Sequence, residues 1–178
     1  MKILFVGDIV GKAGRRAVQS LLPRVVVAHD IDIVIANCEN AAGGLGVTRE
    51  VIKELYRSNI DVLTSGNHIW DKKEVLEFID DYETLLRPAN YPAGSMGRGS
   101  VAVTDSSGRA LGVINLEGRV FMKPLDCPFR VAEREIERLI SHSNIIIVDM
   151  HAEATSEKQA MGWFLDGRVS AVLGTHTH

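Results

Sequence analysis

Residues 62–70 have the sequence Val62-Leu63-Thr64-Ser65-Gly66-Asn67-His68-Ile69-Trp70. A short aliphatic run of strand length leads into a glycine, and an amide and an imidazole side chain follow. Four other apolar runs also lead into side chains that can bind a metal, namely Asp8, Glu39, His151 and the pair His176 and His178. In open α/β sheets ligands bind at the carboxyl ends of the strands, so we expect these side chains to meet at one rim.

The composition is that of a soluble globular domain. The chain has 178 residues, of which 46% are hydrophobic and 24% charged, and its net charge is −3. This charge gives no support for binding an extended nucleic acid, and no apolar run reaches the ~18 residues of a membrane span. Two cysteines, Cys38 and Cys127, are too few for a disulfide framework. We therefore expect one cytoplasmic domain over residues 1–178 with no membrane segment.

The hydrophobic pattern predicts alternating strands and helices with an antiparallel insertion. Continuous apolar runs predict buried strands at 3–6, 31–36, 60–64, 144–150 and 169–174. Helical spacing is found at 14–27, at 72–79 with Val75, Leu76 and Ile79 on one face, and at 129–140 and 157–165. A further helix is expected after Thr48, which is its expected N-cap. Residues 100–104 and 110–115 flank a turn and predict a hairpin, preceded by a long loop at 87–99. The expected fold class is α/β with a mixed sheet.

The residue types at the rim favour a centre with two metal ions. Imidazoles combined with the oxygens of Asp8, Glu39 and Asn67 suit manganese, iron or zinc better than calcium. Six or more candidate ligands are too many for one tetrahedral ion, but they fit two ions ~3.5–4 Å apart that share a carboxylate. If the backbone is extended there, His176 and His178 point in the same direction and could hold one ion or a close pair.

Each of these residues also has an ordinary interpretation when taken alone. A single histidine after a strand is commonly a surface residue, Asp8 could cap a helix, and Asn67 could belong to a turn. Their repeated position at the ends of successive strands favours the metal centre. Gly7, Gly66 and Gly174 agree with it, because a sharp exit from a strand lets side chains close on an ion.

The ordered motifs resemble the calcineurin-like metallophosphoesterases, and they are most similar to the bacterial YmdB-like branch. The motifs are Gly7-Asp8-Ile9-Val10-Gly11, Asn37-Cys38-Glu39-Asn40-Ala41-Ala42, Thr64-Ser65-Gly66-Asn67-His68-Ile69-Trp70, His151 and Gly174-Thr175-His176-Thr177-His178. The resemblance covers the whole chain. It implies two packed mixed β-sheets flanked by helices, a dinuclear centre that is often iron, with manganese or zinc as alternatives, and hydrolysis of phosphodiesters such as 2′,3′-cyclic nucleotides.

The resemblance also implies a role for each matching residue. One ion would take Asp8, Glu39, Asn40 and His178, and the other Glu39, Asn67, His151 and His176, with Glu39 bridging. His68 would be the proton donor to the leaving ribose oxygen after metal-activated hydroxide attacks phosphorus. Val10 stands where the wider superfamily has a histidine, and Glu39 replaces its usual bridging aspartate, and both departures agree with the YmdB-like branch.

Some alternatives stay open. A metal-stabilised protein that senses nucleotides without turnover is a second hypothesis, although a non-ligating imidazole at His68 favours an enzyme. A Rossmann-like nucleotide binder is disfavoured, because residues 7–11 lack the G-x-G-x-x-G spacing. Arg87, Arg98 and Arg119 could contact phosphate or be simply solvated, and Trp70 could stack on a base or belong to the core.

The end of the chain carries a separate expectation. His178 follows directly on the densest ligand motif, and members of the YmdB-like branch continue further, so we expect closing C-terminal strands to be absent. An open sheet edge of this kind would favour self-association, and we expect a homo-oligomer.

Overall fold

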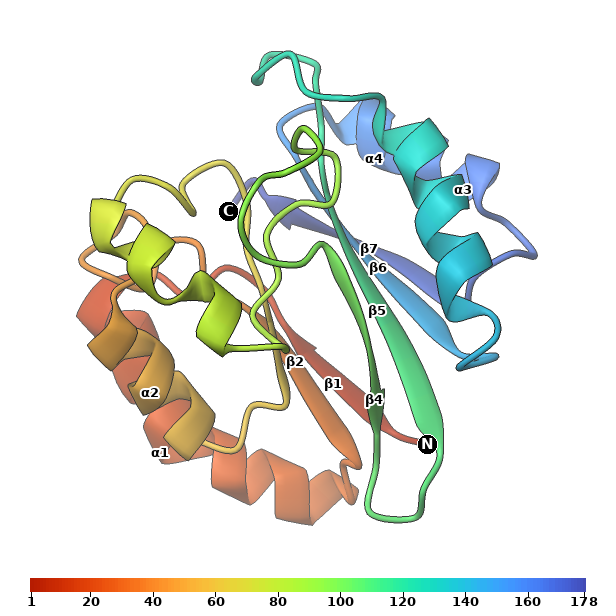
Figure 1. Cartoon of the computed structure of the whole chain (residues 1–178). Coiled ribbons are helices and arrows are strands. Elements are labelled where there is room, and N and C mark those ends of the chain that lie inside the picture. The colour runs from red at the N-terminus through yellow and green to blue at the C-terminus, as the bar shows by residue number, and fades with distance from the viewer.

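Two β-sheets pack face to face between two pairs of helices in the computed structural model, which describes residues 1–178 (Figure 1). The first sheet has the order β1 (Ile3–Val6), β2 (Ile33–Asn37) and β3 (Val62–Thr64), and its strands are all parallel. The second sheet has the order β4 (Ser100–Thr104), β5 (Ala110–Glu117), β6 (Ile146–Ala152) and β7 (Ala171–His176). In it β4 and β5 form an antiparallel hairpin, and β5, β6 and β7 run parallel.

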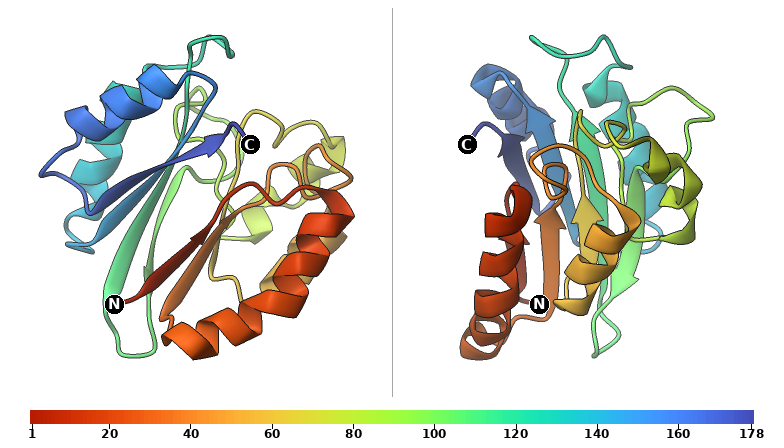
Figure 2. Two further views of the ribbon diagram at one scale, coloured as in Figure 1. Left: turned by 180° about the vertical axis from the view of Figure 1, so that it is seen from behind. Right: turned by 90° about the vertical axis from the view of Figure 1, so that its left-hand side faces the viewer.

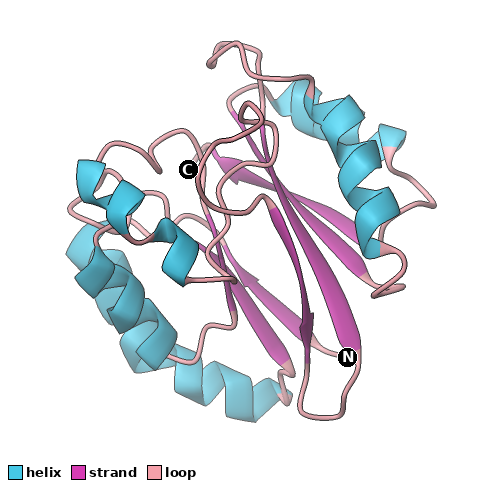
Figure 3. Ribbon diagram, in the orientation of Figure 1, coloured by secondary structure: helices cyan, strands magenta, loops and turns pink.

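The helices cover the outer faces of the two sheets, as Figures 2 and 3 show. Helices α1 (Gly11–His29) and α2 (Arg49–Arg57) lie on the first sheet, and α3 (Pro128–Leu139) and α4 (Thr155–Phe164) on the second. One apolar cluster fills each helix–sheet interface, and a third lies between the sheets, including Ile35, Leu111 and Val113. Burial of these three clusters supplies most of the hydrophobic driving force for this four-layer arrangement. No helix combines the length and the apolar character that crossing a membrane would require.

The predicted fold class is confirmed, with differences in detail. The mixed character resides in the second sheet, since the first is purely parallel. The helix expected at 72–79 is instead two 3₁₀ helices, Lys73–Glu77 and Ile79–Asp81. Three residues per turn bring Val75 and Phe78 to the buried side and leave Leu76 47% exposed, although the predicted helix face included Leu76.

The packing of the two sheets brings the carboxyl ends of β2, β3, β6 and β7 together at one end of the molecule. The chain leaves β1 for Asp8 and β2 for Glu39, and it leaves β3 for Asn67. His151 lies next to the last residue of β6, and His176 is the last residue of β7. The rim predicted from the sequence therefore exists, and it draws on both sheets.

Candidate metal centre

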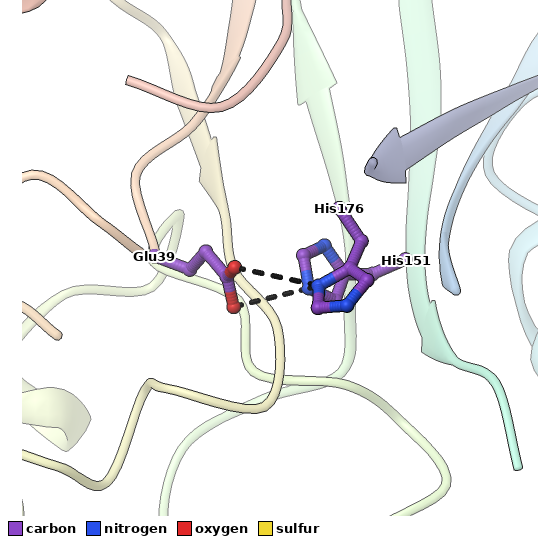
Figure 4. Close-up of side chains that lie close together, drawn as sticks. All are labelled: Glu39, His151 and His176. Atoms are coloured by element: carbon purple, nitrogen blue, oxygen red, sulfur yellow. Dashed lines mark hydrogen bonds and ion pairs between the residues drawn. The ribbon is translucent and has the colours of Figure 1, made fainter. Parts of the chain in front are cut away.

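Three side chains form the centre of the rim: Glu39, His151 and His176. Their potential ligand atoms all lie within 4.8 Å of one another. His151 Nε2 is 3.1 Å from Glu39 Oε2 and 3.1 Å from His176 Nδ1, and Figure 4 shows both imidazoles beside the Glu39 carboxylate. Glu39 and His151 are fully buried. A buried carboxylate that faces two imidazoles at this spacing is a donor set suited to a transition-metal cation.

Two asparagines and an aspartate extend this cluster. Asn67 Oδ1 lies 3.1 Å from His151 Nε2, and the backbone N–H of His176 donates to the Asp8 carboxylate at 3.2 Å. Asn40 Nδ2 donates to Glu39 Oε1 at 3.0 Å, while its own Oδ1 is buried without a hydrogen-bond partner. An orphaned buried carbonyl oxygen is costly unless something positive faces it. The residues present therefore fit a bound cation.

His178 lies at the edge of the cluster. Its side chain is 53% exposed, and its Nε2 is 3.7 Å from Asp8 Oδ2. The backbone between the two terminal imidazoles is not extended, because His176 has a φ of +90°. His176 Nε2 instead lies 2.9 Å from Glu153 Oε2, while His178 turns to Asp8. The structure thus brings six of the seven predicted ligands close together and places the seventh beside Asp8.

His68 has surroundings unlike those of the other histidines. Its Nδ1 lies 2.7 Å from Asp71 Oδ2, and its backbone N–H donates to Glu39 Oε2 at 3.3 Å. The backbone contact fixes His68 next to the cluster, while Asp71 orients its ring from the side. This geometry leaves Nε2 as the nitrogen available to a bound molecule, an arrangement typical of an acid–base residue held by a carboxylate.

The electrostatics of the centre favour positive charge. Burial alone would raise the pKa of Glu39, but the hydrogen bond and charge of His151 bring that pKa below its ordinary value. Burial alone would lower the pKa of His151, but the Glu39 carboxylate raises it above its ordinary value. A divalent cation would compete with the proton shared by this pair, so metal binding is expected to weaken as the pH falls.

A buried network behind His151 sets its tautomer, and sequence reasoning missed it. Thr175 Oγ1 donates to Asp149 Oδ1 at 2.6 Å and lies 2.9 Å from His151 Nδ1. The hydroxyl has one hydrogen, which goes to Asp149, so Nδ1 of a neutral His151 must donate and Nε2 keeps its lone pair for the centre. Thr64 and Asn37, from the other sheet, donate to Asp149 Oδ2 at 2.5 and 3.0 Å.

This network had a signal in the sequence. Asp149 precedes His151 by two positions on β6, so the two side chains share a face of the strand. The pairing of Thr175 with His151 depends on the register between β6 and β7, which a single sequence does not reveal.

Glu117 is a second residue that sequence reasoning missed. It ends β5, pairs in register with His151, and is fully buried with neither carboxylate oxygen hydrogen-bonded. Burial raises the pKa of Glu117 to about 7. The signal was the same as at the other strands, a polar side chain at the end of an apolar run, but the predicted strand stopped at residue 115.

The raised pKa of Glu117 predicts a pH-dependent stability. Between pH 4.5 and about 7, Glu117 carries a proton in the folded, metal-free protein that it lacks in the unfolded chain, so its contribution to the free energy of unfolding falls as the pH rises through that range. Glu117→Gln removes the effect. We compare the free energy of unfolding of the variant with that of the wild type at each pH. At 1.36 kcal/mol per pH unit, this difference should shift in favour of the variant by about 2–3 kcal/mol between pH 5 and pH 8. Urea unfolding of both chelator-treated proteins measures this, and a pH-independent difference would contradict it.

The arginines and the tryptophan considered as substrate contacts mostly have structural roles. Arg87 donates to the backbone oxygens of Met96 and Pro88 and holds the loop between them, and Arg98 pairs with Glu83. Both line a cavity of about 360 Å³ against α3 whose lining includes none of the predicted ligands. Trp70 packs edge-on against the ring of Tyr91 beside the core, which agrees with its core interpretation.

Comparison with known families agrees with this geometry. A family model described as YmdB-like protein matches residues 4–178. The chain belongs to the YmdB-like family. The resemblance stated from the motifs is therefore confirmed, and the match begins within β1 and runs to the last residue.

Individual relatives align with the whole chain. A Bacillus subtilis (strain 168) protein named 2′,3′-cyclic-nucleotide 2′-phosphodiesterase is 48% identical over 178 residues, which are 100% of this chain and 67% of the relative. The crystal structure of a hypothetical protein from Thermus thermophilus superposes with a TM-score of 0.92 at 44% identity, covering 100% of this chain and 68% of that one. A structure described as a novel phosphatase from Mycoplasma pneumoniae gives a TM-score of 0.91 at 33% identity, covering 100% and 64%. The chain thus spans about two thirds of the length of these relatives.

Proposed function

We propose that this protein is a metal-dependent phosphodiesterase that hydrolyses 2′,3′-cyclic nucleotides. The observation that carries the proposal is the buried Glu39–His151–His176 cluster with the oriented His68–Asp71 pair beside it. A cluster that only stabilised the fold would have no use for a further imidazole at its edge that binds no metal. The name of the Bacillus subtilis relative, which is 48% identical, supports the same activity and substrate class.

The donor set supports two metal ions. The residues that would hold them are Asp8, Glu39, Asn40, Asn67, His151, His176 and His178, with Glu39 shared. Mixed nitrogen and oxygen donors suit iron, manganese or zinc. The resemblance to the calcineurin-like metallophosphoesterases favours iron among the three. Bound divalent ions supply Lewis acidity and lower the pKa of water, which is the chemistry that phosphodiester hydrolysis needs at neutral pH.

The residues of the chain perform the remaining tasks. His68 is the proton donor to the leaving ribose oxygen, and Asp71, 2.7 Å from its Nδ1, holds the ring so that Nε2 faces the substrate. Thr175 and Asp149 keep the Nε2 lone pair of His151 directed at the centre.

One experiment tests this function. The purified protein should contain about two transition-metal ions per chain by elemental analysis. It should hydrolyse adenosine 2′,3′-cyclic phosphate with a higher kcat/KM than adenosine monophosphates, lose this activity on chelation, and regain it with Mn²⁺ or Fe²⁺. One ion or none in active protein would contradict the dinuclear centre, and preferred hydrolysis of monoesters would contradict the diesterase. Tight nucleotide binding without turnover would instead support the alternative of a nucleotide-sensing protein.

A further inference from the structure

The loop after β5 places an exposed aromatic side chain beside the candidate metal centre. Phe121 is 89% exposed and lines a cavity of about 320 Å³. The other lining residues are Asn67 and His176, which are predicted metal ligands, together with Met122 and Lys123. Lys123 Nζ donates to the backbone oxygen of Asn67 at 3.1 Å, which ties the loop to the centre. The cavity therefore adjoins the place where a substrate phosphate would be held.

Although the Phe121 side chain is exposed, hydrogen bonds hold the loop that carries it. The buried Glu157 carboxylate of α4 accepts the backbone N–H groups of Arg119 and Val120 at 3.0 and 3.2 Å. Asn90 Nδ2 donates to the backbone oxygens of Glu117 and Asp126, so it clamps both ends of the loop.

Phe121 itself has a φ of +62°, a left-handed conformation that is uncommon for an aromatic residue. Conformations of this kind persist where the surroundings impose them, and they cluster at ligand sites. The anchored loop therefore holds the backbone of Phe121 beside the cavity that its side chain lines.

We propose that Phe121 is the platform on which the nucleobase of the substrate stacks. This inference rests on the proposed function, since a 2′,3′-cyclic nucleotide carries its base a ribose away from the phosphate. Base stacking on an aromatic side chain contributes ~1–3 kcal/mol and tolerates every base, because each base has a π face. Lys123 adds positive charge to the same cavity, which suits an anionic ligand. Phe121 thus determines a preference for nucleotides over other cyclic phosphodiesters, with little choice among bases.

The test compares a substrate that has a base with one that lacks it. Adenosine 2′,3′-cyclic phosphate and glycerol 1,2-cyclic phosphate share the five-membered cyclic diester, and only the first can stack. Phe121→Ala is expected to lower kcat/KM for the nucleotide ~5–150-fold, mainly through KM, and to leave the glycerol ester unchanged. Phe121→Trp should retain the wild-type value. Trp163→Ala is the matched control, because Trp163 is 81% exposed but lies in the last turn of α4, outside this cavity.

A second readout does not depend on turnover. Calorimetric binding of adenosine 2′-phosphate should weaken by the same factor in Phe121→Ala, with metal content unchanged. Equal loss on both esters, or equal binding of the nucleotide by wild type and Phe121→Ala, would overturn the platform. If the wild type hydrolyses neither ester, the proposed function fails, and the binding comparison alone decides the role of Phe121.

Discussion

Replacing His68 by alanine is expected to lower kcat for adenosine 2′,3′-cyclic phosphate by ~10²–10⁴-fold while leaving the metal content unchanged. That loss corresponds to about 3–5.5 kcal/mol of barrier. The reason is that the leaving ribose oxygen is strongly basic and needs a proton as its bond to phosphorus breaks. The His68 ring is hydrogen-bonded to Asp71 and takes no part in the Glu39–His151–His176 cluster, so its removal should not release the metal.

The identity of the leaving group makes this expectation specific. A nitrophenyl phosphodiester expels a weakly basic anion that departs without a proton, so His68→Ala should lose far less rate on it than on the cyclic nucleotide. His151→Ala is the matched control, since it should lose metal and activity together on both substrates. An equal loss on both substrates would contradict proton donation by His68, and loss of metal from His68→Ala would make this residue a ligand.

The layers of the fold could be predicted from the sequence because they depend on local patterns. Continuous apolar runs predicted the parallel strands, and the Asp105–Arg109 turn predicted the β4–β5 hairpin. Thr48 does cap α2, accepting the N–H of Val51. The residues around Leu76 could not be assigned by the same means, because apolar residues three and four apart fit an α-helix and a 3₁₀ helix almost equally well in so short a segment.

The part of the site that could be predicted consists of side chains at the ends of strands. The positions of Asp8, Glu39, Asn67 and His151 at one rim needed only the rule that ligands bind at the carboxyl ends of strands. The hydrogen-bond network that orients these side chains could not be predicted, because it depends on how the two sheets pack against each other. Asn37 donates a hydrogen bond to Asp149 across the interface between the sheets, and the two residues are 112 positions apart in the sequence. The sequence also could not distinguish the roles of Gly7, Gly66 and Gly174, because any atoms that a β-carbon would meet at these positions come from distant parts of the chain.

Those surroundings single out Gly66, and they predict that Gly66→Ala disrupts the metal centre. A β-carbon at this position would overlap the imidazole of His151 and the carboxylate of Glu39. Glu39 follows β2 of the first sheet and His151 lies in β6 of the second, and both are fully buried, so neither can move aside without disturbing the packing behind it. Overpacking of this kind costs ~1–3 kcal/mol of stability. The backbone of Gly66 is not in the left-handed region, so the effect of alanine there comes from the added methyl group alone.

Metal affinity should fall ~10–100-fold or more in Gly66→Ala. A loss of this size follows when the groups that position metal ligands are changed. Gly7→Ala is the matched control, because Gly7 also precedes a predicted ligand, Asp8, but a β-carbon there would meet no atom within 4 Å. Titration of metal-free protein with Mn²⁺, followed by activity at saturating metal, should show a large loss for Gly66→Ala and a value near wild type for Gly7→Ala. Equal affinity in the two variants would mean that the space beside Gly66 is not what holds Glu39 and His151 in ligand geometry.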